Sequence, residues 1–255
     1  MTFERIAFVA SGTDEADAVR LELASAYGSY SVEEADVVVA LGGDGLMLQS
    51  LHSVMGRDVP VFGMNFGSVG FLMNNFARTD LHARLAAAQA TVIYPLEMQV
   101  VDAEGRSHTA LALNEVSLFR TTYQAAKLQI LVDGEIRLDE LICDGILLST
   151  PAGSTAYNLS AHGPILPVGS PLLALTPISP FRPRRWRGAI LNNHASVAFH
   201  VREREKRPVS AVADNVEFKN VIDVVVRQDD TAGVTLLFDP GTSLEERVLI
   251  EQFRY

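Results

Sequence analysis

The sequence predicts two domains of different class: an α/β N-terminal domain with a parallel sheet, and an all-β C-terminal domain of antiparallel, sandwich-like strands. Over residues 1–90, short apolar runs alternate with stretches of helical periodicity, which is the pattern of βαβ units. From residue 96 onward, short strand-like segments follow one another at regular spacing, separated by turn residues. The 255 residues are 48% hydrophobic and 20% charged, which is typical of a globular protein with a sizeable core.

The N-terminal α/β domain is expected over residues 1–95. Its central strand is the unbroken apolar run from Val37 to Leu41, which is typical of a strand buried on both faces of a parallel sheet. Thr79 is expected to cap a helix over residues 80–89. The other expected elements are strands at 6–9 and 59–64 and helices at 14–26 and 45–55.

The β-rich C-terminal domain is expected over residues 96–239, and its clearest turn is Asp133-Gly134, a strong two-residue hairpin signal. One helix is expected over residues 154–161, with Ser154 or Thr155 as its cap. The tail 240–255 has no clear pattern and can pack back on the first domain. Strands are expected at 96–101, 109–119, 127–132, 135–138, 146–149, 172–175, 189–191, 196–201, 209–213, 221–226 and 234–237.

Charge and cysteine content exclude several classes of protein. A net charge of −10 argues against a general binder of nucleic acid or of acidic membranes. The single cysteine, Cys143, allows no intrachain disulfide, and neither a signal peptide nor an apolar stretch of membrane-spanning length is present. We therefore expect a cytoplasmic protein. Eight of the 21 Lys and Arg residues lie between Arg182 and Arg207; we expect solvated loops and strand faces there, with a phosphate-facing or subunit-facing role as the alternative.

A glycine-rich turn, Gly42-Gly43-Asp44-Gly45, follows the central strand and precedes a helical pattern. Glycines let a ligand approach the main chain closely, and the free N–H groups of a helix start attract phosphate. A carboxylate is a poor phosphate ligand, but Asp44 is well suited to accept a proton from a hydroxyl that attacks a phosphate. The alternative is that Asp44 only caps the helix.

Two further constellations carry polar groups. Asn114 and Glu115 interrupt a strand-like run, and an Asn side chain suits a purine edge or a ribose. The segment from Asp144 to Tyr157 ends a strand in Ser-Thr-Pro-Ala-Gly-Ser-Thr-Ala, whose small residues bring the backbone close to a ligand. Tyr157 offers a flat face to a base or a carboxamide. The alternatives are an exposed strand position for the first and a helix cap for the second.

Together these features closely resemble the NAD kinase family. The resemblance rests on GGDG at residues 42–45, on Asn114-Glu115, and on the pattern DGxxxSTPxGSTAYxxS at 144–160; the Gly70-Phe71 loop also fits. GGDG is shared with diacylglycerol-type lipid kinases and phosphofructokinases, whereas STPxGSTAY is the discriminating motif. Asp214-Asn215 stands where a late Asp-Gly or Asp-His pair often lies in the family, so Asp214 is carried over only weakly.

The resemblance implies transfer of the γ-phosphoryl group of ATP to the 2′-hydroxyl of the adenosine ribose of NAD, giving NADP, with polyphosphate as an alternative donor. It implies that Asp44 is the general base and that Gly42, Gly43 and Gly45 bind phosphate oxygens. Mg²⁺ would accompany ATP, and family members are usually homodimers or homotetramers. The implied dinucleotide contacts are Phe71 at the adenine, Asn114 and Glu115 at the adenosine, and Asp144, Ala152, Thr155, Ala156, Tyr157, Asn158, Leu159 and Ser160 along the rest of the site.

Two alternative functions remain at this point. One is a GGDG-type kinase for a lipid or a sugar phosphate, and STPAGSTAY argues against it. The other is a catalytically silent NAD- or NADP-sensing module, and the intact Asp44 argues against that. A substrate panel with ATP tests the first alternative, and a measurement of turnover rather than binding tests the second.

Overall fold

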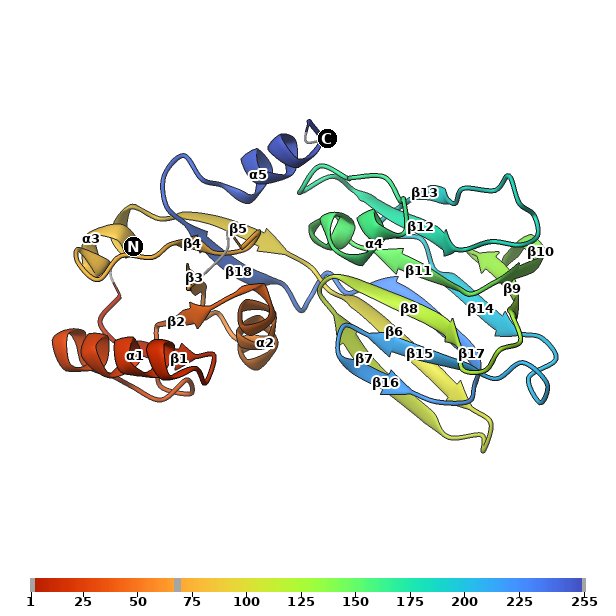
Figure 1. Ribbon diagram of the computed structural model, residues 1–255, viewed down its shortest axis with the longest axis horizontal. Helices are drawn as coiled ribbons and strands as arrows, with labels where there is room; N and C mark the ends of the chain where they lie inside the picture. The colour runs from red at the N-terminus through yellow and green to blue at the C-terminus, as the bar shows by residue number, and fades with distance from the viewer. Residues whose placement is uncertain (1–2, 67–69, 254–255) are drawn as a thin grey trace. The chain divides into compact units, whose positions relative to one another are not determined.

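The computed structural model describes residues 3–66 and 70–253, and the chain divides into two compact units (Figure 1). The first unit comprises Met1–Ile93 and Thr231–Tyr255, and the second comprises Tyr94–Asp230. The predicted fold class is confirmed, because the first unit combines helices with a mainly parallel sheet and the second consists of antiparallel sheets. Residues 67–69, in the loop that leads to Gly70-Phe71, lie outside the described residues.

The first unit is built on a sheet of order β1-β2-β3-β18-β5, with β4 beside β3. Every residue of β2 (Val37–Gly42) is buried, as its unbroken apolar run predicted. Side chains of β1, β2, β3 and α1 share one hydrophobic core. The other elements are β1 (Ile6–Ala10), α1 (Asp14–Tyr27), α2 (Asp44–Val54), β3 (Val61–Asn65), β4 (Asn74–Asn75), α3 (Leu81–Ala87), β5 (Gln89–Ile93), β18 (Val234–Phe238) and α5 (Leu244–Glu251).

Two expectations for the first unit are wrong. Residues 234–237 do not belong to the β-rich domain: as part of β18 they pair in parallel with β3 and antiparallel with β5. The helix expected over residues 80–89 ends at Ala87, and its N-cap is Asp80 rather than Thr79. Residues 89–93 form β5 instead, because the β-branched side chains of Thr91, Val92 and Ile93 favour a strand that β18 can pair with.

The second unit contains two six-stranded antiparallel sheets, of order β10-β9-β14-β17-β6-β7 and β13-β12-β11-β8-β15-β16. One hydrophobic cluster takes buried side chains from both sheets, including Ile130 and Phe199 from the first and Val116 and Leu148 from the second. The two sheets therefore enclose a common core, as in a sandwich. The strands are β6 (Leu96–Asp102), β7 (Ser107–Ala112), β8 (Glu115–Arg120), β9 (Ala126–Val132), β10 (Glu135–Cys143), β11 (Gly145–Ser149), β12 (Leu172–Ile178), β13 (Ala189–Asn192), β14 (Val197–Val201), β15 (Val209–Ala213), β16 (Val216–Phe218) and β17 (Val221–Gln228).

The helix expected over residues 154–161 is broken into a 3₁₀ turn at Ala152–Thr155 and a single α-helical turn, α4 (Tyr157–Ser160). Neither Ser154 nor Thr155 caps it, because its N-cap is Ala156, which has no capping side chain. The Ser154 hydroxyl instead donates to the carbonyl of Pro151 at 2.7 Å and accepts from the amide of Leu166 at 3.0 Å. Within the described part of the chain, no helix has the length and apolar character needed to cross a bilayer.

Candidate functional site

The glycine-rich turn of the first unit connects β2 directly to α2. Helix α2 begins at Asp44, its N-cap is Gly43, and no side chain caps it. The first backbone N–H groups of a helix have no partner within the helix. This turn therefore presents main-chain donors next to one carboxylate, in an arrangement that attracts phosphate.

The carboxylate of Asp44 is held by a second segment of the same unit. Its Oδ2 accepts from the amide of Phe71 at 2.7 Å, and its Oδ1 accepts from the amide of Leu72 at 2.8 Å. A Cβ on Gly70 would lie 2.8 Å from Asp44 Oδ1, so a larger residue at that position would force the carboxylate or the loop to shift. The side chain of Asp44 is thus directed at this loop, whose Phe71 amide it bonds, rather than at its own helix.

Asn114 and Glu115 lie in a bend of the second unit, not inside one continuous strand as residues 109–119 were expected to form. Strand β7 ends at Ala112 and β8 begins at Glu115. Asp214, in the turn between β15 and β16, stabilises the bend: its carboxylate accepts from the amides of Leu113 at 2.7 Å, Asn114 at 3.0 Å and Glu115 at 3.3 Å. Asp214, which the family resemblance indicated only weakly, therefore holds the backbone of the Asn114-Glu115 pair in place.

The Ser-Thr-Pro-Ala-Gly-Ser-Thr segment packs against the same bend. Thr150 donates from its amide to the carbonyl of Asn114 at 3.0 Å and from its hydroxyl to that of Leu113 at 2.7 Å. A Cβ on Gly153 would lie 2.2 Å from the carbonyl oxygen of Asn114, which is closer than any side chain allows. The Asn114-Glu115 bend and the Ser-Thr-Pro-Ala-Gly-Ser-Thr segment therefore form one cluster. They can pack this closely because residue 153 is glycine.

Glu115 is the electrostatically unusual group of this cluster. Its Oε2 is buried without a hydrogen-bond partner. Burial, together with the charge of Asp214, raises the pKa of Glu115 to about 7, while a hydrogen bond from the amide of Tyr157 opposes the shift. A buried acceptor without a donor is costly in a native protein and is typical of a position that a ligand completes.

Tyr157 and Asp144 are each positioned by a side chain of β8 that the sequence did not single out. The Tyr157 ring stacks on Phe119 with 5.7 Å between ring centroids and an interplanar angle of 11°. Asp144 Oδ1 accepts from Nε of Arg120 at 2.5 Å. The pairing of β8 with β11, in which Phe119 is opposite Gly145, creates both contacts. Nothing in the local pattern could reveal them, because strand periodicity does not identify the neighbouring strand.

The last expected contacts lie in the 3₁₀ turn and α4, where the side chain of Asn158 has internal partners. The Asn158 side chain is fully buried: its Nδ2 donates to the carbonyls of Ser154 at 3.0 Å and Pro164 at 2.9 Å, and its Oδ1 accepts from Thr176 at 2.7 Å. The side-chain amide of Asn158 therefore stabilises the turn. Ala152 is buried as well, whereas Thr155, Ala156, Tyr157 and Leu159 are half-buried and Ser160 is exposed.

Two other groups of side chains bear on ligand chemistry. Among residues 3–66 and 70–253, no three His, Cys, Asp or Glu side chains gather closely enough to hold a metal ion. In the basic region, Arg207 pairs with Glu203 at 3.1 Å and donates to the carbonyl of Ala125, while Arg182 and Arg184 lie over the exposed ring of Phe181. These contacts fit the expectation of solvated loops and strand faces.

Comparisons with known proteins agree on one family. Residues 22–91 match the model of the ATP-NAD kinase N-terminal domain, and residues 113–228 match that of the ATP-NAD kinase C-terminal domain. An NAD kinase from Mesorhizobium japonicum is 60% identical over 250 residues, which cover 98% of this chain and 97% of the relative. An NAD kinase from Rhizobium meliloti is 55% identical over 251 residues, covering 98% of each chain.

Solved structures share the fold at much lower sequence identity. The yeast NADH kinase complexed with NADH has a TM-score of 0.85 at 20% identity, covering 98% of this chain and 87% of that one. An NAD kinase from Archaeoglobus fulgidus in complex with ATP has a TM-score of 0.75 at 22% identity, covering 96% of each chain. With both family models matched and close relatives aligned over nearly its whole length, this chain belongs to the NAD kinase family.

Proposed function

We propose that this member of the NAD kinase family transfers the γ-phosphoryl group of ATP to the 2′-hydroxyl of the adenosine ribose of NAD, with Asp44 as the general base. The observation that carries the proposal is the Asp44 carboxylate, which sits in a phosphate-attracting turn and is oriented by two amides rather than used as a helix cap. Each carboxylate oxygen accepts one of these bonds and keeps a second lone pair. That lone pair can take the proton of an attacking hydroxyl.

Phosphoryl transfer requires positioning and charge neutralisation more than covalent help. The amides of Gly42, Gly43 and Gly45 would bind phosphate oxygens at the start of α2. Mg²⁺ would enter with ATP, held mainly by phosphate and water oxygens, and Asp44 is the acidic side chain in the first turn of α2. When bound, the ion neutralises charge on the phosphates.

The dinucleotide contacts proposed for the second unit follow from its bend. The side-chain amide of Asn114 and the carboxyl of Glu115 would bind the adenosine. Asp144, Tyr157 and the backbone of the turn that contains Ala152, Thr155 and Ala156 would line the rest, with Leu159 and Ser160 at its end. The partnerless Oε2 of Glu115 favours this assignment, because a ribose hydroxyl or an adenine amino group would satisfy it.

The test separates catalysis from binding. NADP formation is measured with ATP and with polyphosphate as donors, for the wild-type protein and for Asp44→Asn, which keeps the shape but is a far weaker proton acceptor. General-base catalysis contributes about 10²–10⁴-fold, so kcat should fall by about that factor while the KM for NAD changes little. Full activity of Asp44→Asn would contradict the assignment, and wild-type binding of NAD without any turnover would favour a sensing module.

The assembly proposed for this chain is a homodimer or homotetramer, and the proposed location is the cytoplasm. Two six-stranded sheets leave outer strands whose edges need covering, and the apolar side chains of Ile190 on β13 and Val216 on β16 are exposed at such outer positions. A sedimentation experiment at micromolar concentration should give a species larger than the 27.7 kDa of one chain. A single species of that mass would contradict the proposed assembly.

A further inference from the structure

The loop that holds Asp44 is itself held by an arginine from the C-terminal helix. Arg247, on α5, donates from Nη1 to the carbonyls of Gly70 at 3.0 Å and Phe71 at 3.2 Å. These carbonyls belong to the same two peptide groups whose N–H sides bond to Asp44, because the Gly70–Phe71 peptide carries the amide of Phe71 and the next peptide carries the amide of Leu72.

The planarity of the peptide bond links the two sets of contacts. In a trans peptide the C=O and N–H groups point in opposite directions, so fixing one side fixes the direction of the other. Two consecutive peptide groups thus lie between the guanidinium of Arg247 and the carboxylate of Asp44, with every C=O toward the cation and every N–H toward the anion. Hydrogen bonds arranged in this sense polarise and strengthen one another.

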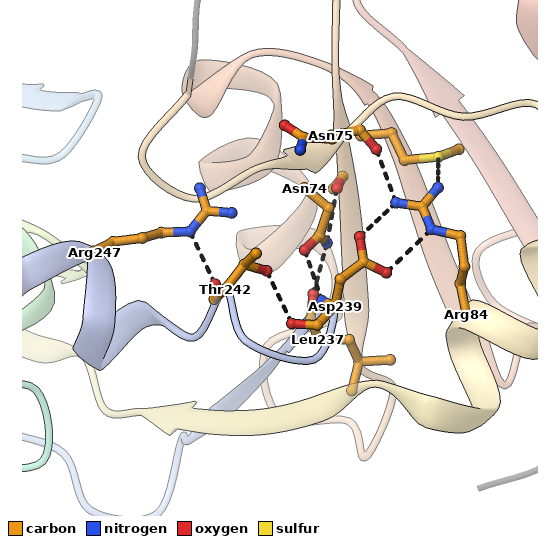
Figure 2. Close-up of polar contacts among 9 residues, drawn as sticks. Asn74, Asn75, Arg84, Leu237, Asp239, Thr242 and Arg247 are labelled. Atoms are coloured by element: carbon orange, nitrogen blue, oxygen red, sulfur yellow. Dashed lines mark hydrogen bonds and ion pairs between the residues drawn. The ribbon is translucent and has the colours of Figure 1, made fainter.

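Arg247 is held in place independently of this loop. Its Nε donates to the carbonyl of Thr242 at 3.0 Å (Figure 2). Its guanidinium lies 5.3 Å from the ring centroid of Phe238. Thr242 in turn donates from its hydroxyl to the carbonyl of Asp239 at 2.9 Å. Helix α5 is capped by the Ser243 hydroxyl. The cation is therefore supported by its own segment and can act as a fixed anchor for the loop.

The segment before α5 is fixed to the sheet by a separate set of contacts. The carboxylate of Asp239 pairs with Arg84 at 2.6 Å, and its amide donates to the side chain of Asn74 at 2.9 Å (Figure 2). Asn74 also donates to the carbonyls of Gly63 and Leu237 at 3.0 Å each. Arg84 thus secures the C-terminal segment without contacting the loop at residues 70–72, which makes it a natural control for Arg247.

The charge of Arg247 is partly withdrawn from water. Burial lowers its pKa, and the carboxylates of Asp44 and Asp239 act in the opposite direction. Asp44 therefore lies within electrostatic range of the Arg247 guanidinium.

We infer that Arg247 is a positioning residue for phosphoryl transfer: through the peptide groups of Gly70–Phe71 and Phe71–Leu72 it orients the carboxylate that accepts the proton. The inference rests on the proposed role of Asp44. It assigns the C-terminal helix a part in catalysis, because α5 follows Asp44 by some 200 residues in sequence and supplies the anchor for its orienting loop. Without the guanidinium, the carbonyls of Gly70 and Phe71 lose their donor. The N–H groups that bond to Asp44 then lose their fixed direction.

The principal test is Arg247→Met, which keeps an unbranched side chain over Phe238 and removes the donors. A misplacement of about 1 Å in a reacting group can cost about 10²-fold, so we expect kcat to fall by about 10–10²-fold while the KM for NAD stays within about twofold. Arg247→Lys keeps the positive charge and an ammonium donor but lacks the guanidinium fork, so its kcat should lie between those of Arg247→Met and the wild type. A wild-type kcat for Arg247→Met would overturn the inference.

Two further measurements exclude a merely structural role. Arg84→Met removes the ion pair that holds the same C-terminal segment, and it should lower the melting temperature without lowering kcat at temperatures well below the transition. Equal losses of kcat in Arg84→Met and Arg247→Met would contradict a specific role for Arg247.

The double variant Asp44→Asn/Arg247→Met should have a kcat no lower than that of Asp44→Asn alone, since the carboxylate that Arg247 positions is already gone.

The double variant also separates this inference from the proposed function. If Asp44→Asn alone is fully active, the proposed base is wrong. If Asp44→Asn is slow but the two substitutions multiply their effects, Asp44 remains the base and Arg247 acts elsewhere, which overturns the inference.

Discussion

Asp44 and Asp214 both accept hydrogen bonds from main-chain N–H groups, and they do so for opposite purposes. In the first unit, Asp44 accepts two amides from the loop at residues 70–72. In the second unit, Asp214 accepts three amides from the bend at residues 113–115. At the first position the carboxylate is the proposed reacting group and the loop orients it. At the second position the carboxylate is the support, and the proposed ligand-binding groups are the residues whose backbone it holds.

The comparison shows that function cannot be read from a hydrogen-bond motif alone. What distinguishes the two regions is the group left unsatisfied. Next to Asp214, the unsatisfied atom is Oε2 of Glu115, whose own carboxyl is buried. Next to Asp44, the groups open to a ligand are the amides at the start of α2, where the N-cap receives no side chain. In each region the supporting contacts are complete and the proposed ligand contacts are not.

The largest effect that can break this comparison is expected for Asp214→Ala. The variant leaves three amides of the bend without their acceptor, and removing one partner from a charged hydrogen bond costs about 1–3 kcal/mol. We expect the free energy of unfolding to fall by about 3 kcal/mol and the KM for NAD to rise. Denaturant titration and steady-state kinetics measure both quantities. A variant with normal stability and a pure loss of kcat would make Asp214 a reacting group like Asp44.

The two regions also use glycine differently, and a matched pair of alanine substitutions tests this. At Gly153 an added Cβ would strike the carbonyl of Asn114, and overpacking costs about 1–3 kcal/mol. At Gly45, within the first turn of α2, an added Cβ meets nothing within 4 Å. Gly153→Ala should therefore lower the melting temperature and raise the KM for NAD.

Gly45→Ala should behave in the opposite way. Replacing a helical glycine by alanine stabilises a helix by up to about 1 kcal/mol, so its melting temperature should be unchanged or higher. The KM for ATP should nevertheless rise, because the methyl group stands where phosphate must approach the main chain. An unchanged KM for ATP would show that this position is not part of the phosphate site.

The smallest expected effect is a pH dependence that comes from Glu115. Its pKa in the folded protein is raised to about 7 from an ordinary value of 4.5, so between these values the folded state holds a proton that the unfolded state has lost. Stability therefore decreases as the pH rises from about 4.5 to about 7, by on the order of 1–3 kcal/mol after allowance for solvent screening. Glu115→Gln should remove this part of the pH dependence and leave the protein more stable than the wild type near pH 8. If the wild type and Glu115→Gln show the same dependence of stability on pH, the pKa of Glu115 is that of an ordinary carboxyl group and the prediction is wrong.

The sequence by itself determined the fold class, the family and the strand, turn and helix start around residues 42–45, because each of these depends on local pattern. An unbroken apolar run followed by Gly42-Gly43-Asp44-Gly45 specifies a buried strand, a turn and a helix start without reference to the rest of the chain. The hairpin at Asp133-Gly134 is equally local, and β9 and β10 pair across it as expected.

The tertiary structure alone decided which segments become neighbours. Strand β18 has the same pattern whichever sheet it joins, and only its pairing with β3 and β5 places it, and α5 after it, in the first unit. The buried amide of Asn158 and the contact of Arg247 with the loop beside Asp44 follow from such neighbours. Periodicity sets which face of a strand or helix is buried, but the partner on that face is chosen by packing between segments far apart in sequence.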